Sequence, residues 1–596
     1  MQRFLRIRRT LAVPLAAITA ATGAVALSLT VAATPAQAAD NGLAPKPYMG
    51  WSSWSQQSSK YPGLNPNGDY SYLNEANVIK QADYMAANLK QYGYDRINMD
   101  AGWWSAWDWT PGYDGNGRQT ANLTRFPRGM KWMIDYIHGK GLKAGLYLPV
   151  GLEKASYDKG DLPIAGAPGC TTHQIVYSDL RSTNGWDSSY KIDYSKPCAQ
   201  KYVDSLGRML ADLGADFLKF DGVGPGSGKN DSNHDNRPDV QAMSQALISS
   251  GRDIVFEISA WPLDYSGIAT WEKYANAWRA HTDVECYCST LVTWDNSVKA
   301  RFDAGTAQWL NHVKPGGWVD FDSINVGNGQ MDGINQTERQ TYMTLWAIAA
   351  APLYIGDDLT KLDAYGLSLL TNTEVIAQNQ AGIPARPRQP GASQQTWVAK
   401  NADGTYTIGL FNLGGSTTNV TVTWGDLGFG NASNVRDMWT RTDLGTQATG
   451  FTATLPAHGS RLIRVTPGGT PPTGTSFEAE NATRTGNAVV VGCPACSGGA
   501  KVGNFYANST IQSTINAPTA GTYNLTLAYT AGDNSRTATI TINGTGTQTL
   551  QFTSTGGWNT PGTKTITANL QTGNNTITLD SGTGYGPDLD KITVTS

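Results

Sequence analysis

The feature that most constrains the fold is a repeated alternation of short apolar runs with helical periodicity, from about Asn41 to Gly382. Parallel strands joined by helices give this pattern, because each strand is buried on both faces and each helix on one. We expect strands over Arg96–Met99, Lys143–Leu148, Phe217–Phe220, Ile254–Ile258 and Trp318–Asp320, and helices over Glu75–Tyr92 and Gly129–Gly139. The repeat predicts a (β/α)8 TIM barrel. A doubly wound open sheet is the alternative, but no glycine-rich phosphate fingerprint opens any of its helices.

One expected strand carries two charged residues. In Asp216-Phe-Leu-Lys219-Phe-Asp221-Gly222, apolar residues surround the lysine, and Asp221 stands where the strand ends. Lys219 and Asp221 are two residues apart, so their side chains share one face of the strand. The ammonium group would keep the carboxylate ionised, as a nucleophile requires. A buried ion pair that closes a barrel layer would give the same pattern, and this stretch alone does not separate the two interpretations.

More aspartates follow other expected strands: Asp100 after Met99, Asp283 in Trp278-Arg279-Ala-His-Thr-Asp283, and Asp320 and Asp322 after Pro315-Gly-Gly-Trp318. A parallel barrel brings these strand ends to one rim. Glycoside hydrolysis needs two carboxyl groups there, one to stabilise the oxocarbenium-like transition state and one to protonate the leaving oxygen. Helix capping would explain any single aspartate but explains the whole set poorly. Tryptophans near the same rim are expected sugar platforms: Trp51, Trp54, Trp103, Trp104 and Trp261.

The composition and periodicity of the sequence change after Gly382. Residues 395–411 and 420–465 alternate apolar residues with threonine and predict an antiparallel β domain. A short Pro/Gly/Thr linker follows, and the strictly alternating chain beyond it predicts a β-sandwich of the jelly-roll kind. The expected limits are 40–384 for the barrel, 385–466 for the antiparallel domain, 467–475 for the linker and 476–596 for the sandwich.

The N-terminus has the pattern of a secretory signal. Four arginines precede an apolar, alanine-rich run from Leu11 to Ala33, which ends at Ala36-Gln-Ala38. We expect residues 1–39 to be a signal peptide and the protein to be extracellular. A membrane anchor is the weaker alternative because of the small-residue site. No later segment is apolar enough to span a bilayer, so we expect no membrane partner.

Charge and cysteine content narrow the function classes. The 45 Lys and Arg residues nearly balance the 48 Asp and Glu residues, so no nucleic-acid partner is expected. The six cysteines of the exported part favour disulfides over metal binding. Cys170 with Cys198 would close a loop, and Cys493 with Cys496 a tight turn. Cys286 and Cys288 would form a very small ring if they paired locally.

Several motifs in order resemble glycoside hydrolase family 27, the α-galactosidase (melibiase) and α-N-acetylgalactosaminidase family, over about Asn41 to Thr466. They are Asn41-Gly-Leu-Ala, Met49-Gly-Trp51 with Trp54, Phe126-Pro-Arg-Gly129, Leu218-Lys-Phe-Asp-Gly222, Trp278-Arg279 with Asp283, Pro315-Gly-Gly-Trp318 and Trp346-Ala-Ile-Ala-Ala-Ala-Pro352. The resemblance implies a barrel followed by a β domain, hydrolysis with retention of configuration, and no cofactor for catalysis. It also implies a disulfide between Cys170 and Cys198.

The resemblance assigns roles by position. Asp221 matches the nucleophile of the family and Asp283 its acid/base. The positions that match sugar-contacting residues are Trp54, Asp100, Tyr147, Lys219, Arg279 and Asp322.

Two departures bear on the sugar. Family α-galactosidases usually have two consecutive aspartates after the second strand, which grip the 4- and 6-hydroxyls, whereas this chain has Asp100-Ala101. The loop Glu257-Ile-Ser-Ala260 is one residue longer than the usual pattern. A site that lacks a partner for a hydroxyl loses discrimination. The family also contains isomalto-dextranases, which act on α-1,6-glucans, and β-L-arabinopyranosidases, and the first is the main alternative to α-galactoside hydrolysis.

The C-terminal domain resembles carbohydrate-binding modules of family 35 or 6. The motifs are Phe477-Glu-Ala-Glu480, Ala517-Pro, Gly521-Thr-Tyr523, Ile542-Asn-Gly544, Thr555-Gly-Gly-Trp558 and Asp588-Leu-Asp590. The resemblance implies a structural Ca²⁺ held by Glu478, Glu480 and Asp590, and oxygen-only ligands suit that ion. Unmetallated surface carboxylates are the alternative.

The sequence as a whole predicts a secreted retaining α-glycosidase that acts on an oligo- or polysaccharide. A non-catalytic, lectin-like binder is the rival from another class. It would keep Trp558 and its neighbours, but it has no reason to keep Lys219, Asp221, Arg279 and Asp283 together. A structural polysaccharide-associated protein is disfavoured by the barrel pattern.

Overall fold

The computed structural model describes residues 41–427, 429–468 and 475–595. The expected signal peptide, residues 1–39, and most of the expected linker lie outside the described residues. Within the described ranges, none of the helices is both long and apolar enough to cross a membrane.

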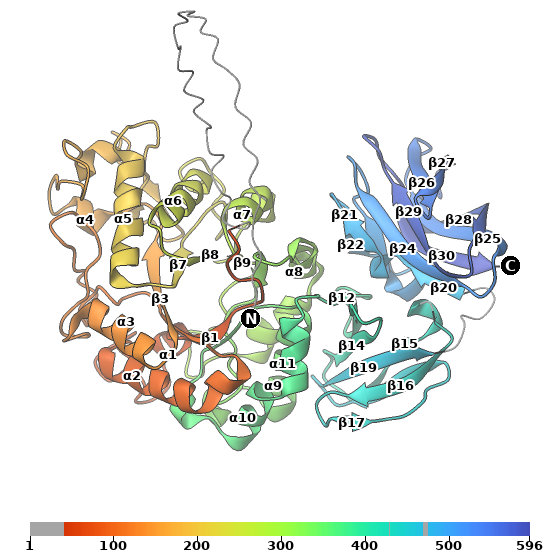
Figure 1. Ribbon diagram of the computed structural model, residues 1–596, viewed down its shortest axis with the longest axis horizontal. Helices are drawn as coiled ribbons and strands as arrows, with labels where there is room; N and C mark the ends of the chain where they lie inside the picture. Colours follow the sequence, from red (N-terminus) through yellow and green to blue (C-terminus); the bar gives the residue numbers. More distant parts are fainter. Residues whose placement is uncertain (1–40, 428, 469–474, 596) are drawn as a thin grey trace, which may run out of the picture. The chain divides into compact units, whose positions relative to one another are not determined.

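Eight parallel strands form the first sheet, as expected for the barrel (Figure 1). In spatial order they are β10 (Trp318–Asp320), β9 (Ala277–Arg279), β8 (Val255–Ile258), β7 (Phe217–Asp221), β3 (Lys143–Pro149), β2 (Arg96–Met99), β1 (Met49–Ser52) and β11 (Leu353–Ile355). The two end strands are joined through a parallel bridge between Ile324, just beyond β10, and Ile355 of β11. The sheet therefore closes on itself.

A helix follows each of these strands before the next one begins (Figure 1). The helices are α1 (Trp54–Ser58) with α2 (Glu75–Tyr84), α3 (Gly129–Gly139), α5 (Ala199–Leu213), α6 (Arg237–Ser249), α7 (Ile268–Tyr274), α8 (Ala304–Trp309), α9 (Gln336–Ile348), and α10 (Ala364–Leu370) with α11 (Thr373–Gln380). The long loop after β3 holds α4 (Lys154–Tyr157) and a small sheet of β4 (Leu152–Glu153), β6 (Ser189–Tyr190) and β5 (Ser182–Thr183).

Local sequence explains how α5 leads into β7. The apolar positions of α5 are buried, among them Val203, Leu206 and Leu210. The helix ends at Gly214, which has φ 90° and so adopts a left-handed conformation that glycine tolerates best. The chain then enters β7, whose Phe217, Leu218 and Phe220 are buried in the barrel wall.

The expected helix over Glu75–Tyr92 is helical throughout but is not one α-helix. The α-helix α2 ends at Tyr84, and a π-helical turn (Met85–Leu89) and a 3₁₀ turn (Lys90–Tyr92) continue it. Met85 and Leu89 are both fully buried. Hydrophobic spacing locates a helix but does not distinguish these closely related hydrogen-bonding patterns.

An antiparallel β domain follows the barrel, as expected. One sheet holds β12 (Arg386–Pro387), β13 (Gln394–Lys400), β14 (Tyr406–Asn412), β19 (Ser460–Gly468), β16 (Asn431–Asp437) and β17 (Thr442–Asp443), and a second pairs β15 (Thr418–Thr423) with β18 (Gly450–Leu455). Val420, Ile408 and Val465 belong to the core of this domain.

The C-terminal part is a sandwich of two antiparallel sheets. One holds β22 (Val489–Gly492), β23 (Ala500–Gly503), β30 (Asp588–Thr595), β25 (Gly521–Ala531) and β28 (Gly557–Leu570), with β20 (Thr475–Glu478) also paired to β30. The other holds β21 (Thr483–Thr485), β24 (Thr510–Ala517), β29 (Gly573–Asp580), β26 (Arg536–Ile542) and β27 (Thr545–Phe552). Residues from both sheets, such as Leu525 and Ile577, form one separate core.

Candidate active site

A cavity of about 850 Å³ opens at the carboxyl ends of the barrel strands. Six of the predicted site residues line it: Trp54, Asp100, Tyr147, Lys219, Asp221 and Asp283. Asp100 directly follows β2, Tyr147 lies in β3, and Lys219 and Asp221 lie in β7. The topology therefore gathers side chains that are far apart in the sequence at one rim, where barrels of this kind hold their reactive groups.

Lys219 forms an ion pair with Asp100 in the cavity lining. Its Nζ lies 2.9 Å from Asp100 Oδ2, and both side chains are largely buried. Burial by itself would lower the pKa of Lys219, but the carboxylates of Asp100 and Asp221 outweigh it and raise that pKa. The lysine is therefore a permanent positive charge beside these two carboxyl groups.

Asp221 is held at the end of β7 by backbone contacts. The amide of Gly222 donates to Asp221 Oδ1 at 2.8 Å. Gly222 has φ 73°, and a Cβ at this position would lie 3.0 Å from the Trp186 ring, so only glycine fits directly after the carboxylate. Burial, together with Asp221 and Asp100, raises the pKa of the Tyr147 hydroxyl, which stays protonated and able to donate.

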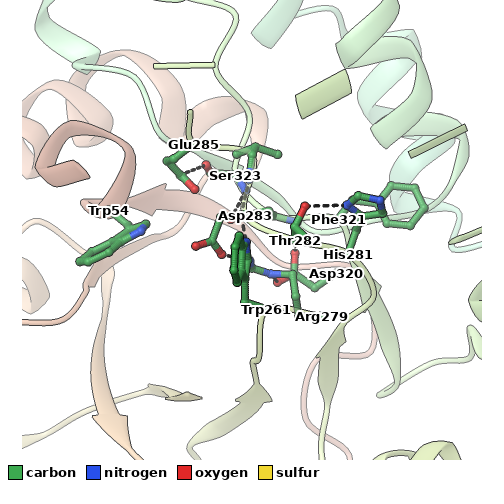
Figure 2. A network of polar contacts seen from close by, with 12 residues as sticks. Trp54, Trp261, Arg279, His281, Thr282, Asp283, Glu285, Asp320, Phe321 and Ser323 are labelled. Atoms are coloured by element: carbon green, nitrogen blue, oxygen red, sulfur yellow. Dashed lines mark hydrogen bonds and ion pairs between the residues drawn. The ribbon is translucent and has the colours of Figure 1, made fainter. Parts of the chain in front are cut away.

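Asp283 lies in the loop after β9, which is two strands along the barrel from β7. Arg279 Nη1 donates to Asp283 Oδ1 at 2.8 Å and to Asp322 Oδ2 at 2.8 Å. In Figure 2 the Asp283 carboxyl lies between the Trp54 side chain and Arg279, to which it is hydrogen-bonded. Burial raises the pKa of Asp283 against the opposing effect of Arg279, which suits a group that must carry a proton.

Arg279 and Asp322 do not line the cavity, unlike the other six predicted residues. Arg279 is 1% exposed and Asp322 3% exposed. Arg279 also donates to Asp320 Oδ2 at 3.2 Å, and Asp322 accepts from the amide of Val284 at 2.9 Å. Arg279 therefore contacts the Asp283 carboxyl directly, and Asp322 contacts Arg279 and the amide of the residue after Asp283.

Two of the tryptophans expected as sugar platforms are core residues instead. Trp51 and Trp103 are fully buried. The Trp51 indole donates to the carbonyl of Asp357, and that of Trp103 to the carbonyl of Tyr147. The other three, Trp54, Trp104 and Trp261, line the cavity as expected.

Sequence reasoning missed several cavity residues that lie on long loops, namely Trp109, Trp186, Glu153 and Tyr287. Trp186 is 51% exposed. Burial raises the pKa of the Glu153 carboxyl to about 7. The sequence around these loop residues has no periodicity from which their place in the cavity could be predicted. The Cys-Tyr-Cys triplet around Tyr287 was the one unusual local pattern among them. Both positions of departure, Ala101 and Ala260, line the same cavity.

The six cysteines of the described residues are all paired, as Cys170–Cys198, Cys286–Cys288 and Cys493–Cys496. The first pair is the one that the family resemblance implies. It ties the loop after β3, which supplies Glu153 and Trp186 to the cavity wall, to the residue before α5.

The three residues expected to hold Ca²⁺ lie close together in the sandwich and are almost fully buried. Ser497 links two of them, because its Oγ donates to Glu478 Oε1 at 2.7 Å and its amide donates to Asp590 Oδ1 at 3.0 Å. Within the described residues, neither oxygen of the Glu480 side chain has a hydrogen-bond partner. Burial, followed by repulsion from Glu478, raises the pKa of Glu480. An all-oxygen set with buried, unsatisfied carboxylate atoms fits a calcium ion.

The sandwich also has a surface pocket of about 430 Å³. Trp558, 41% exposed, and Tyr585, 61% exposed, line it. Arg536 lies 4.7 Å from the centre of the Trp558 ring, and Lys501 Nζ lies 2.8 Å from Asp588 Oδ2. Exposed aromatic rings beside polar groups suit the apolar face and hydroxyls of a sugar.

Comparison with known families covers all three parts of the chain. The family described as alpha galactosidase A matches residues 46–190 and 186–381. The alpha galactosidase C-terminal beta sandwich domain matches residues 391–465, and the family 35 carbohydrate binding module matches residues 475–595.

Individual relatives agree with these matches. Alpha-galactosidase 2 of Arabidopsis thaliana is 28% identical over 435 residues, which are 72% of this chain and 91% of the relative. A β-L-arabinopyranosidase from Geobacillus stearothermophilus is similar in structure, with a TM-score of 0.63, 27% identity, and coverage of 71% of this chain and 98% of that one. The isomalto-dextranase of Arthrobacter globiformis T6 shares the fold over 92% of this chain and 96% of its own, with a TM-score of 0.62 and 22% identity.

Proposed function

The chain belongs to the alpha galactosidase A family, and we propose that it is a secreted, retaining glycosidase that hydrolyses terminal α-linked galactosides in oligo- or polysaccharides. One observation carries the proposal. Asp221 and Asp283 line the same cavity, Asp221 beside a buried ammonium group and Asp283 beside a buried guanidinium group. Two carboxyl groups in different electrostatic surroundings are what acid and nucleophile roles require.

In the first step, the Asp221 carboxylate attacks the anomeric carbon while Asp283 gives its proton to the leaving oxygen. A covalent glycosyl-enzyme results. In the second step, the Asp283 carboxylate takes a proton from water, which attacks the same carbon and releases Asp221. Two inversions leave the configuration unchanged.

The other proposed sugar-binding residues have supporting roles. Lys219 and Asp100 would bond substrate hydroxyls from the base of the cavity, and Tyr147 can donate from the same wall. Trp54 would pack against the sugar ring. Arg279 and Asp322 would act by fixing Asp283, since they do not reach the cavity surface.

Ala101 favours a second candidate, exo-hydrolysis of α-1,6-glucan. It lines the cavity where a second aspartate would grip galactose hydroxyls, and its methyl group accepts no hydrogen bond. The similar β-L-arabinopyranosidase makes a β-L-arabinopyranoside a necessary third substrate in any screen.

We propose that residues 476–596 form a sugar-binding module, with Trp558 and Tyr585 in its binding pocket, and that the limits of the other parts are those expected from the sequence. Glu478, Glu480 and Asp590 would hold a structural Ca²⁺, whose double positive charge would offset the charge of two of these three buried carboxylates. We propose no cofactor for catalysis and neither nucleic acid nor membrane as a partner.

A side-by-side screen of substrates tests the proposal. The substrates are p-nitrophenyl α-galactoside, p-nitrophenyl β-L-arabinopyranoside, melibiose, raffinose, galactomannan and dextran. We expect the α-galactosides to have the highest kcat/KM. Preference for dextran would establish the second candidate. No hydrolysis of any glycoside would contradict an enzymatic function and would favour a carbohydrate-binding protein.

A further inference from the structure

A disulfide encloses one residue of the cavity wall. Cys286 and Cys288 are bonded to each other, so Tyr287 is the single residue between them. Tyr287 has φ 52°, a left-handed conformation that a bulky residue rarely adopts. Backbone hydrogen bonds hold both cysteines of this disulfide-closed loop. Cys286 N donates to Leu291 O at 3.1 Å, and Lys60 N donates to Cys288 O at 2.7 Å. Such outliers persist where the surroundings enforce them, and they cluster at functional sites.

The Tyr287 hydroxyl contacts two predicted site residues. It donates to Asp283 Oδ2 at 2.5 Å and accepts from Trp54 Nε1 at 3.2 Å. Tyr287 is 36% exposed and lines the cavity. Its hydroxyl therefore contacts Asp283 at the surface that a substrate would approach.

We propose that the Cys286–Cys288 disulfide presents Tyr287 to Asp283, and that Tyr287 is a positioning residue for this carboxyl group throughout the reaction. The inference rests on the proposed acid/base role of Asp283.

The two oxygens of Asp283 have different neighbours. Arg279 donates to Oδ1, so Oδ2 is the oxygen left to carry the proton for the leaving group. A tyrosine hydroxyl is both donor and acceptor. Tyr287 can therefore donate to Oδ2 when Asp283 is ionised, and it can accept the Oδ2 proton when Asp283 is protonated, until the leaving oxygen takes that proton and Tyr287 donates again. Because Trp54 bonds only one lone pair of the hydroxyl oxygen, the second remains for Asp283.

The charged and titratable groups that face Asp283 determine the direction of the expected pH effect. They come from Arg279 on β9, Asp322 after β10, Lys219 on β7, and Glu285 and Tyr287 on its own loop. Burial and Asp322 raise the pKa of Asp283, whereas Arg279, Lys219 and the Tyr287 hydroxyl lower it. Loss of the hydroxyl should therefore raise this pKa and move the basic limb of the kcat/KM profile to higher pH.

Tyr287→Phe tests the inference because it keeps the ring and removes only the hydroxyl. On p-nitrophenyl α-galactoside and melibiose, whose leaving groups need more protonation, we expect kcat/KM to fall roughly tenfold. On 2,4-dinitrophenyl α-galactoside, whose leaving group needs no acid, we expect a change of less than about twofold. The basic limb should move up by about one pH unit. Equal losses on all substrates with an unmoved basic limb, or no loss at all, would overturn the inference.

The disulfide is tested by Cys286→Ser/Cys288→Ser, which should reproduce the leaving-group dependence of Tyr287→Phe. The matched control is Cys493→Ser/Cys496→Ser, which removes another local disulfide outside the barrel and should leave aryl galactoside hydrolysis unchanged. Full activity of the first double variant on melibiose would contradict the role of the disulfide. Asp283→Ala must itself be leaving-group dependent; if it is not, the proposed function fails, whatever Tyr287→Phe does.

Discussion

Asp221 and Asp283 should respond differently to removal, because only one of them bonds to the sugar. A nucleophile is needed for every substrate, so Asp221→Asn should abolish turnover of all glycosides tested. Asp283→Ala should spare glycosides of very acidic phenols in the first step, while melibiose becomes nearly inert. Initial rates on a series of aryl galactosides measure both effects.

Azide separates the two roles by product. In Asp283→Ala the glycosyl-enzyme should accumulate, and azide, which needs no deprotonation, should release it through the vacated space as an α-glycosyl azide. A β-glycosyl azide from this variant would show that the two roles are exchanged. So would an α-glycosyl azide from Asp221→Gly without rescue of Asp283→Ala.

Glu153 gives a prediction about stability and pH. Burial raises the pKa of its carboxyl from 4.5 to about 7, so the folded protein binds a proton that the unfolded chain releases between these values. Stability should therefore fall as pH rises through this window. Glu153→Gln, which stays neutral, should raise Tm at pH 8 and leave it nearly unchanged at pH 4. Asp158→Asn, an exposed carboxyl of the same loop, is the control. A Tm gain that is the same at both pH values would contradict the assignment.

At the scale of single residues, sequence located the rim but not the depth of each side chain. The spacing of Lys219 and Asp221 placed both on one face of β7, and both line the cavity. Arg279 and Trp103 also stand near strand ends, yet they are buried. Alternation along a strand gives the face of a side chain, whereas its depth depends on which strands and loops cover it, and that information is not local.

At the scale of elements, the local pattern located some strands of the barrel and missed others of the same length. Arg96–Met99 and Trp318–Asp320 have the expected bounds. The equally short strands β1, β9 and β11 were not predicted, because a run of three or four residues is too short to establish a period. The bridge from Ile324 to Ile355 that closes the barrel is likewise invisible to a local pattern.

The predicted ion site joins elements of the sandwich that lie at its two ends in sequence, near β20 and in β30. Ca²⁺ that binds only the folded module should raise its Tm in proportion to the logarithm of ion concentration. EDTA should reverse the shift, and Glu480→Gln should reduce it strongly. Differential scanning calorimetry measures the Tm shift, with Mg²⁺ as the control. A Tm that does not respond to Ca²⁺ would contradict the proposed calcium site.

At the scale of the whole molecule, catalysis and polymer binding should be separable. Every residue that lines the large cavity lies between Trp54 and Tyr287, far before the C-terminal module in sequence. A chain ending at Gly474 should therefore keep nearly unchanged kcat/KM on p-nitrophenyl α-galactoside. It should lose activity on galactomannan, where a tethered module raises the effective concentration of substrate. Equal losses on both substrates would mean that the module is part of the catalytic fold.

The central claim, double displacement at an α-galactoside, has one direct test. Proton NMR during rapid hydrolysis of p-nitrophenyl α-galactoside identifies the anomer of galactose that appears before mutarotation. Attack by Asp221 followed by water activated by Asp283 inverts the anomeric centre twice, so α-galactose should appear first. First appearance of β-galactose would show a single displacement and would contradict the assignment of Asp221 as the nucleophile.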